Sequence, residues 1–89
     1  MNTLAIEASA TKIWFDEFNL WVNLSDGRIL AVPLEYFPRL LHATKEERRN
    51  YVLSGNGTGI HWEEIDEDIS VHGLLLGRKD IALTKKTNN

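Results

Sequence analysis

The sequence predicts an α+β domain in which an antiparallel three-stranded β-meander packs against short helices. Three observations predict this class. Apolar and polar residues alternate with the period of a strand in the first third of the chain, and apolar residues recur at helical spacing over 34–53. The glycine-rich segment 54–59 then breaks the helical pattern and returns the chain to an extended segment.

The meander is predicted from three extended segments, the first at 11–16. In Phe18-Asn-Leu-Trp-Val-Asn-Leu24, the apolar side chains share one face and Trp21 lies with two asparagines on the other. Asp26-Gly27 favours a two-residue type I′ turn, so the segment 28–32 is predicted to return as the hairpin partner. We expect the helical segment to cover Trp21, with a contact surface as the alternative. Trp14 and Trp62 are expected in the core, their indole N–H groups donating to carbonyls.

Two helix starts are recognisable in the middle of the chain. Pro38 suits the first turn of a short helix over 38–42, and Thr44 with Glu47 forms a capping box that starts a helix at 45. The helical pattern runs to Leu53. An extended segment is predicted over 60–65. The apolar segment 70–76 is equally consistent with a strand and with one helical turn, because Gly73 interrupts it.

Length and composition narrow the class of protein. At 89 residues the chain is predicted to be one domain, 1–89, with its core over 10–77 and a partly frayed tail over 78–89, while the placement of 1–10 stays open. The absence of cysteine favours a cytoplasmic protein. No apolar run is long enough to span a membrane. The net charge of −3 disfavours direct nucleic-acid binding, which usually needs a basic surface.

Several motifs together resemble a known family. They are Asp26-Gly-Arg28, Pro33-Leu34 with Phe37-Pro-Arg-Leu-Leu41, Ala43-Thr44, and Gly57-Thr-Gly-Ile-His-Trp62 with Asp66-Glu-Asp-Ile-Ser70. The combination, over roughly 10–77, resembles the small bacterial domain of unknown function 2442. Ile65 and Tyr51 depart from it, where the family usually has leucine and often tryptophan. The resemblance implies an α+β fold without an established activity, and a second small protein encoded nearby as partner, in an arrangement like a toxin–antitoxin pair.

The sequence contains few features that indicate catalysis or a bound cofactor. The chain lacks cysteine and a Gly-x-Ser-x-Gly motif, so we expect no enzyme and no cofactor. A divalent-metal or small-ligand site is the alternative function. Its candidate ligands are His61, Asp66 and Asp68, because imidazole and carboxylate suit zinc or manganese. No recognised spacing such as HxxxH completes that site.

The acidic stretch after His61 carries the main prediction. Three adjacent carboxylates at 66–68 repel one another unless cations compensate. An arginine of the same chain, Arg39, Arg48 or Arg49, or a basic partner could supply the charge. We therefore predict a protein–protein interaction module, the acidic partner and potential antitoxin of a small basic protein. The predicted contact residues are Glu63, Glu64, Asp66, Glu67, Asp68 and Arg39. An exposed edge of the meander would also invite self-association.

Overall fold

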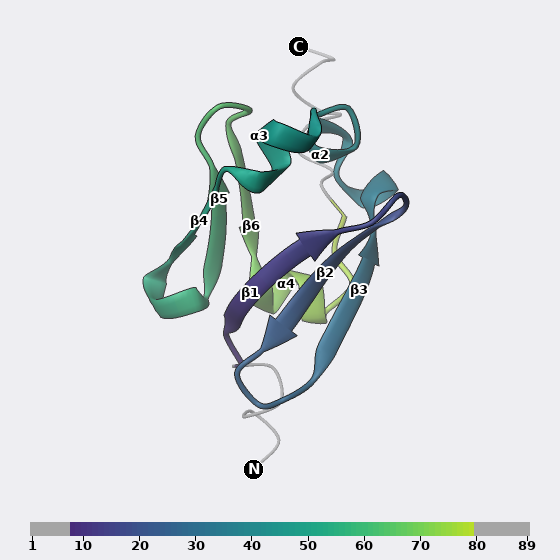
Figure 1. The fold of residues 1–89 in the computed structure, drawn as a ribbon. Helices are drawn as coiled ribbons and strands as arrows, with labels where there is room; N and C mark the ends of the chain where they lie inside the picture. Colours follow the sequence, from purple (N-terminus) through teal and green to yellow (C-terminus); the bar gives the residue numbers. More distant parts are fainter. Residues whose placement is uncertain (1–7, 80–89) are drawn as a thin grey trace.

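A computed structural model describes residues 8–79 and contains two antiparallel sheets, each of three strands (Figure 1). The first sheet consists of β1 (Ala10–Phe15), β2 (Asn19–Leu24) and β3 (Ile29–Pro33). The second consists of β4 (Tyr51–Ser54), β5 (Gly59–Trp62) and β6 (Glu67–Ser70). The other elements are η1 (Leu34–Tyr36), α2 (Pro38–Leu41), α3 (Lys45–Arg49), η2 (Gly55–Gly57) and α4 (Val71–Leu75). The α+β class and the predicted meander are confirmed, whereas the second sheet was not predicted.

The first sheet follows the alternation of its residues. In β2, Leu20, Val22 and Leu24 are buried and the intervening residues are half-buried. Burying one such aliphatic side chain contributes about 1.5–3 kcal/mol, so this face anchors the sheet to the core. Phe18 was predicted on the same face, but it precedes β2 and is 70% exposed. Its backbone N–H donates to the side chain of Asp16 in the turn between β1 and β2.

The β2–β3 hairpin is confirmed, but its predicted two-residue type I′ turn is wrong. Such a turn needs positive φ at both central residues, and Asp26 does not have it. Gly27, with φ of 94°, is the left-handed residue. The Gly27 N–H donates to the Leu24 carbonyl, and the Leu24 N–H donates to the Arg28 carbonyl. Residues 25–27 therefore form a loop longer than the predicted two residues.

The outer face of the first sheet carries two half-buried tryptophans. Trp14 and Trp21 stack with ring centroids 5.9 Å apart and planes within 7°, and the indole N–H of Trp21 donates to Asp16. The prediction that helices cover Trp21 is therefore wrong, as is the core placement of Trp14, because the buried residues of β1 and β2 lie on the opposite face. Stacking removes much of each ring from water without a covering layer.

The helical segment contains two short helices, and the second of them, α3, has a capped N-terminus. Pro38 occupies the first turn of α2, as predicted. The predicted capping box of α3 is present: the Glu47 N–H donates to Thr44 Oγ1, and the Thr44 N–H donates to the Glu47 carboxylate. The guanidinium of Arg48 donates to the carbonyls of Leu40 and Leu41, at the C-terminal end of α2. This ties α3 to α2.

Residues 51–53 are a strand, which corrects their predicted helical state. In β4, Tyr51 and Leu53 are half-buried while Val52 is 59% exposed, the alternation of a strand. Tyr51 pairs with Trp62 and Leu53 with Ile60 across to β5. The pairing with a segment farther along the chain overrides the local helical pattern, and α3 ends at Arg49.

The segment predicted as extended over 60–65 ends earlier than expected. β5 stops at Trp62, residues 63–66 turn, and β6 runs back beside β5 with Trp62 opposite Glu67. Ser70 then caps α4 by accepting from the N–H of Gly73, which decides between the strand and the helical turn left open for 70–76.

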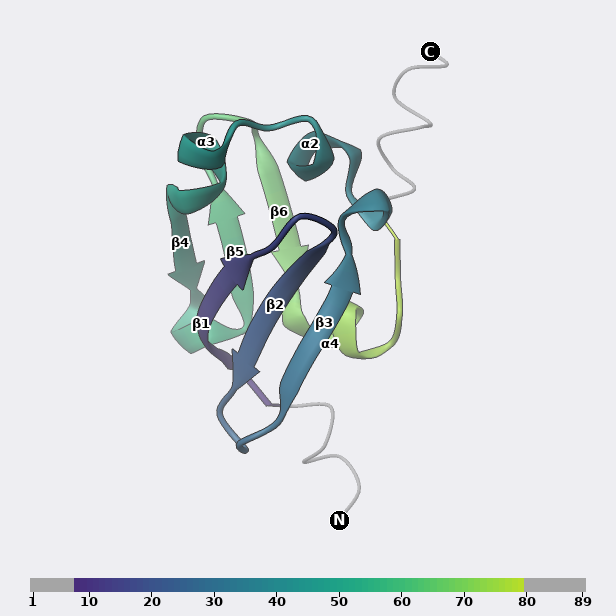
Figure 2. The ribbon, with the colours of Figure 1, turned by 45° about the vertical axis from the view of Figure 1, so that its right-hand side comes forward.

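The core lies between the two sheets, under the short helices (Figure 2). Trp62, Leu20 and Ile60 are fully buried, and Trp62 contacts Phe15 of β1 edge to face. The Trp62 indole donates to the Arg48 carbonyl, as predicted for a core tryptophan. Within residues 8–79, no helix is long and apolar enough to cross a membrane. Of the predicted tail over 78–89, residues 80–89 lie outside the described residues, as do residues 1–7 of the segment 1–10 whose placement stayed open.

Candidate functional site: an acidic hairpin

The predicted acidic stretch forms the tip of the β5–β6 hairpin. The Asp66 N–H donates to the Glu63 carbonyl at 3.3 Å and closes the turn. Asp66 has a φ of 53°, a left-handed conformation that aspartate tolerates better than most residues. We call Glu63, Glu64, Asp66 and Asp68, with this turn, the acidic hairpin. The sequence placed these carboxylates close together, and the turn presents them at one end of the second sheet.

Glu67 does not belong to this surface, which corrects its predicted role as a partner-binding residue. It alternates inward in β6 and is 3% exposed. Its carboxylate lies 3.7 Å from the guanidinium of Arg39, which also donates to the Asp66 carbonyl at 2.7 Å. Arg39 is itself mostly buried. The predicted internal pairing is therefore present, and Arg39 and Glu67 fix the turn to α2.

The other carboxylates face solvent. The side chain of Glu63 is 90% exposed and that of Asp68 is 75% exposed. Asp66 is exposed, and exposed Glu64 accepts a hydrogen bond from the Asn50 side chain at 3.0 Å. Arg39 holds the backbone at Asp66, so the turn that carries Glu63, Glu64 and Asp66 is fixed, and Asp68 follows it in β6.

His61 lies between two of these carboxylates. Its Nε2 is 2.8 Å from Glu63 and its Nδ1 is 2.8 Å from Asp68. The hydrogen bond to Glu63 and then that to Asp68 raise the pKa of His61 above its usual 6.5, because both stabilise the protonated ring. With both ring nitrogens protonated, the imidazolium can donate to both acids at once.

This arrangement predicts the titration of His61. We expect an NMR titration of the imidazole to give a pKa above 6.5 in the wild type, and a value closer to 6.5 in the Glu63→Gln variant. Since the folded pKa is raised, the stabilisation is fully present below the unfolded pKa and is lost as pH rises through the folded pKa. An unchanged His61 pKa in Glu63→Gln would contradict the assignment.

The predicted metal ligands are only partly brought together. Asp68 contacts His61, but Asp66 points from the turn and is not among the hydrogen-bond partners of the ring. In residues 8–79, no group of three or more histidine, aspartate or glutamate side chains is arranged to hold a metal ion. Both nitrogens of His61 already contact carboxylates on opposite sides of the ring, so a metal ion would have to displace one of them.

One feature near the hairpin was missed by the sequence reasoning. A groove separates β1 from α3, and its lining includes Phe15, Lys45, Arg49 and Tyr51. Arg49 was named from the sequence as a partner for the acidic stretch and was assigned to no groove. The sequence contained one indication of this groove, because no strand was predicted to cover the outer edge of residues 11–16.

The fold and this site define a small two-sheet α+β domain with a rigid acidic hairpin. A family model described as "Protein of unknown function (DUF2442)" matches residues 10–80. The chain belongs to this family, which confirms the resemblance drawn from its motifs. No curated protein matches the chain.

Two solved structures are similar to the chain, and both come from bacteria. A protein of unknown function from Rhodospirillum rubrum is 31% identical, with a TM-score of 0.72, and the match covers 82% of this chain and 90% of that one. An uncharacterised protein from Chromobacterium violaceum is 22% identical, with a TM-score of 0.73, over 96% of this chain and 82% of the other. The second likeness shows the fold alone.

Proposed function

We propose that this protein is a cytoplasmic, non-enzymatic interaction module that binds a small basic protein through its acidic hairpin, as an antitoxin binds its toxin. One observation carries the proposal. Four solvent-facing carboxylates lie on the turn 63–66 and the start of β6, where Arg39 holds the backbone at Asp66, so their positions are set before a partner arrives. A preorganised charged surface loses little conformational entropy on binding and attracts an oppositely charged partner over a distance.

The contact residues that we propose are fewer than those predicted from the sequence, because only accessible carboxylates are kept. Glu63, Glu64, Asp66 and Asp68 are accessible, while Glu67 is buried beside Arg39. His61 adds positive charge to this surface when it is protonated. The charge that a basic partner meets therefore becomes more negative as pH rises through the pKa of His61. The proposed encounter is electrostatic, so it should weaken with added salt.

The test uses a pair of variants that remove equal charge. Glu64→Gln/Asp66→Asn neutralises two acids of the hairpin, keeps an acceptor for Asn50 and places asparagine where φ is positive. Glu35→Gln/Glu46→Gln neutralises two exposed acids elsewhere. We expect the full chain, immobilised and exposed to nuclease-treated lysate of its host, to retain a small basic protein. The hairpin variant should then bind the purified partner about tenfold or more weaker, as lost charge pairs at interfaces predict.

Two outcomes would refute the proposal. One is that no basic protein is retained by the folded wild type. The other is that both double variants bind the retained protein equally well, since charge at the hairpin would then be irrelevant. Circular dichroism on both variants confirms that neither substitution unfolds the chain. Glu67 is left unchanged in this design because its substitution would alter stability and confuse the result.

A further inference from the structure

Within residues 8–79, the outer edge of β1 leaves the backbone N–H and C=O of Phe15 without a hydrogen-bond partner. The Asp16 N–H donates to the Asn19 carbonyl, so in an antiparallel pair the backbone groups of Phe15 and Ile13 point away from β2. The Ile13 N–H confirms this direction, because it donates at 3.4 Å to the hydroxyl of Tyr51 on β4. β1 lies at the end of the strand order β1-β2-β3, so in the part of the chain that the structure describes no strand of its sheet covers this edge.

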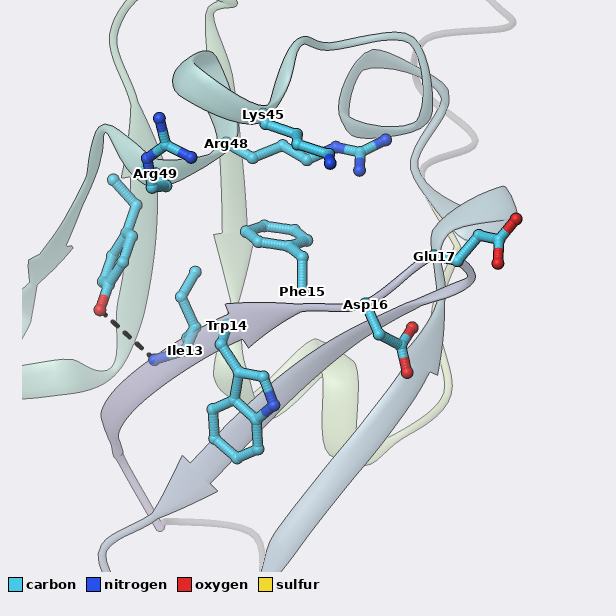
Figure 3. Close-up of a pocket in the computed structure, with 9 residues that line it drawn as sticks. Ile13, Trp14, Phe15, Asp16, Glu17, Lys45, Arg48 and Arg49 are labelled. Atoms are coloured by element: carbon cyan, nitrogen blue, oxygen red, sulfur yellow. Dashed lines mark hydrogen bonds between the residues drawn. The ribbon is translucent and has the colours of Figure 1, made fainter.

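A groove runs along this edge (Figure 3). Its volume is about 940 Å³, at the upper end of the range for ligand sites in proteins. One wall is the β1 edge with the half-buried ring of Phe15, and the opposite wall is formed by α3 and Tyr51. The groove therefore combines unpaired backbone N–H and C=O groups with an apolar surface. An added strand uses the first for hydrogen bonds and the second for side-chain contacts.

The α3 wall is basic. Lys45, Arg48 and Arg49 line it and lie above Phe15 in Figure 3. The guanidinium of Arg48 is bound to carbonyls of α2, but within residues 8–79 neither Lys45 nor Arg49 forms an ion pair. At the far end, the carboxylate of Asp16 is held by the Trp21 indole and two backbone N–H groups. Glu17 also lines this end of the groove, and its carboxylate is directed away from Lys45 and Arg49 in Figure 3. The side of the groove formed by α3 therefore presents positive charge to a ligand.

We propose that this groove receives an extended, acidic segment of a partner protein, which adds to β1 as a fourth strand. The outward N–H and C=O of Phe15 would pair with the segment's backbone, as in other cases of strand addition. Successive side chains of the segment would then point to opposite faces of the extended sheet. Apolar ones would contact Phe15 and Tyr51, and a carboxylate would meet Lys45 or Arg49. This surface is distinct from the acidic hairpin, and the inference does not rest on the proposed function.

The test pans a phage-displayed library of linear octapeptides against the immobilised full chain. We expect enriched sequences in which aspartate or glutamate alternates with apolar or β-branched residues. A synthetic peptide of the enriched sequence should shift the amide NMR signal of Phe15. The double variant Lys45→Glu/Arg49→Glu should bind it at least tenfold weaker. The matched control, Arg78→Glu/Lys79→Glu, reverses two exposed positive charges outside the groove and should bind it like the wild type.

A backbone control separates strand addition from simple charge attraction. N-methylation of alternate residues removes the peptide's N–H donors on one side at a time, and one of the two methylated versions should lose binding. The inference is overturned if no acidic sequences are enriched, or if the enriched peptide binds Lys45→Glu/Arg49→Glu as well as wild type. It is also overturned if the peptide shifts signals away from β1. A dimer in sedimentation equilibrium that protects the Phe15 amide would instead assign the edge to a second copy.

Discussion

Replacing Gly57 with alanine is expected to lower the free energy of unfolding by about 2–4 kcal/mol, from backbone strain plus a steric clash. Gly57 has a φ of 90°, where residues with a Cβ are strained. An added Cβ would clash with the carbonyl oxygen of Ala10 and would lie 3.1 Å from the Cβ of Ser9. Ala10 starts β1 and Ser9 directly precedes it, so Gly57 is the point at which η2, between β4 and β5, meets the start of the first sheet.

Gly27 provides the matched control for this prediction. Its φ of 94° is nearly the same, but a Cβ there would meet nothing within 4 Å. Gly27→Ala should therefore show only the conformational cost, about 1–2 kcal/mol. Urea unfolding followed by circular dichroism measures both variants. If the two alanine variants lose equal stability, the close approach of Gly57 to β1 has no energetic importance and the argument from contact is wrong.

Truncating Trp62 to alanine is expected to have the largest effect of any single change, about 3–5 kcal/mol. Trp62 is fully buried, contacts Phe15 of the first sheet and Tyr51 of the second, and donates its indole N–H to the Arg48 carbonyl. A chain of 89 residues has a total stability of about 4–13 kcal/mol. Trp62→Ala can therefore leave a substantial fraction unfolded at 25 °C, which far-ultraviolet circular dichroism with urea titration would reveal.

Two other variants make the Trp62 result specific. Trp62→Phe keeps an aromatic ring but removes the donor to Arg48, and should cost less than the alanine change. Trp21→Ala removes a tryptophan of the outer face, which is half-buried and loses a ring contact without opening a core cavity. It should cost clearly less than Trp62→Ala. Equal losses for Trp21→Ala and Trp62→Ala would show that Trp62 does not join the two sheets as described.

Much of the fold was predictable because its signals are local. The alternation of Leu20 and Val22, the capping box of Thr44 with Glu47, and Pro38 at a helix start each depend on residues close in sequence. The second sheet was not predictable in this way. Val52 continued a helical pattern, and only the pairing of β4 with β5 makes that segment a strand. Trp14 and Trp21 were misplaced for a related reason, since periodicity says which residues share a face but not which face is covered.

In the candidate site, too, some features were predictable from the sequence and others depended on contacts between distant segments. The concentration of carboxylates after His61 was evident in the sequence, and so was the choice of arginine as an internal partner. Which carboxylate is paired was not evident. Glu67 is buried because β6 alternates and places it opposite Trp62, on the inward side where Arg39 reaches it. The two-residue period of inward and outward side chains thus separates the buried Glu67 from its exposed neighbours.

The amino-acid sequence by itself determined the class of fold, the family, the first sheet, the starts of the short helices and the location of the acidic residues. These follow from local periodicity, capping and motifs. Only the tertiary structure decided that residues 51–70 form a second sheet, that Glu67 is internal, and that β1 borders a basic groove. Each of these depends on pairing and burial between segments distant in the chain, and the free energy of such contacts outweighs local propensity.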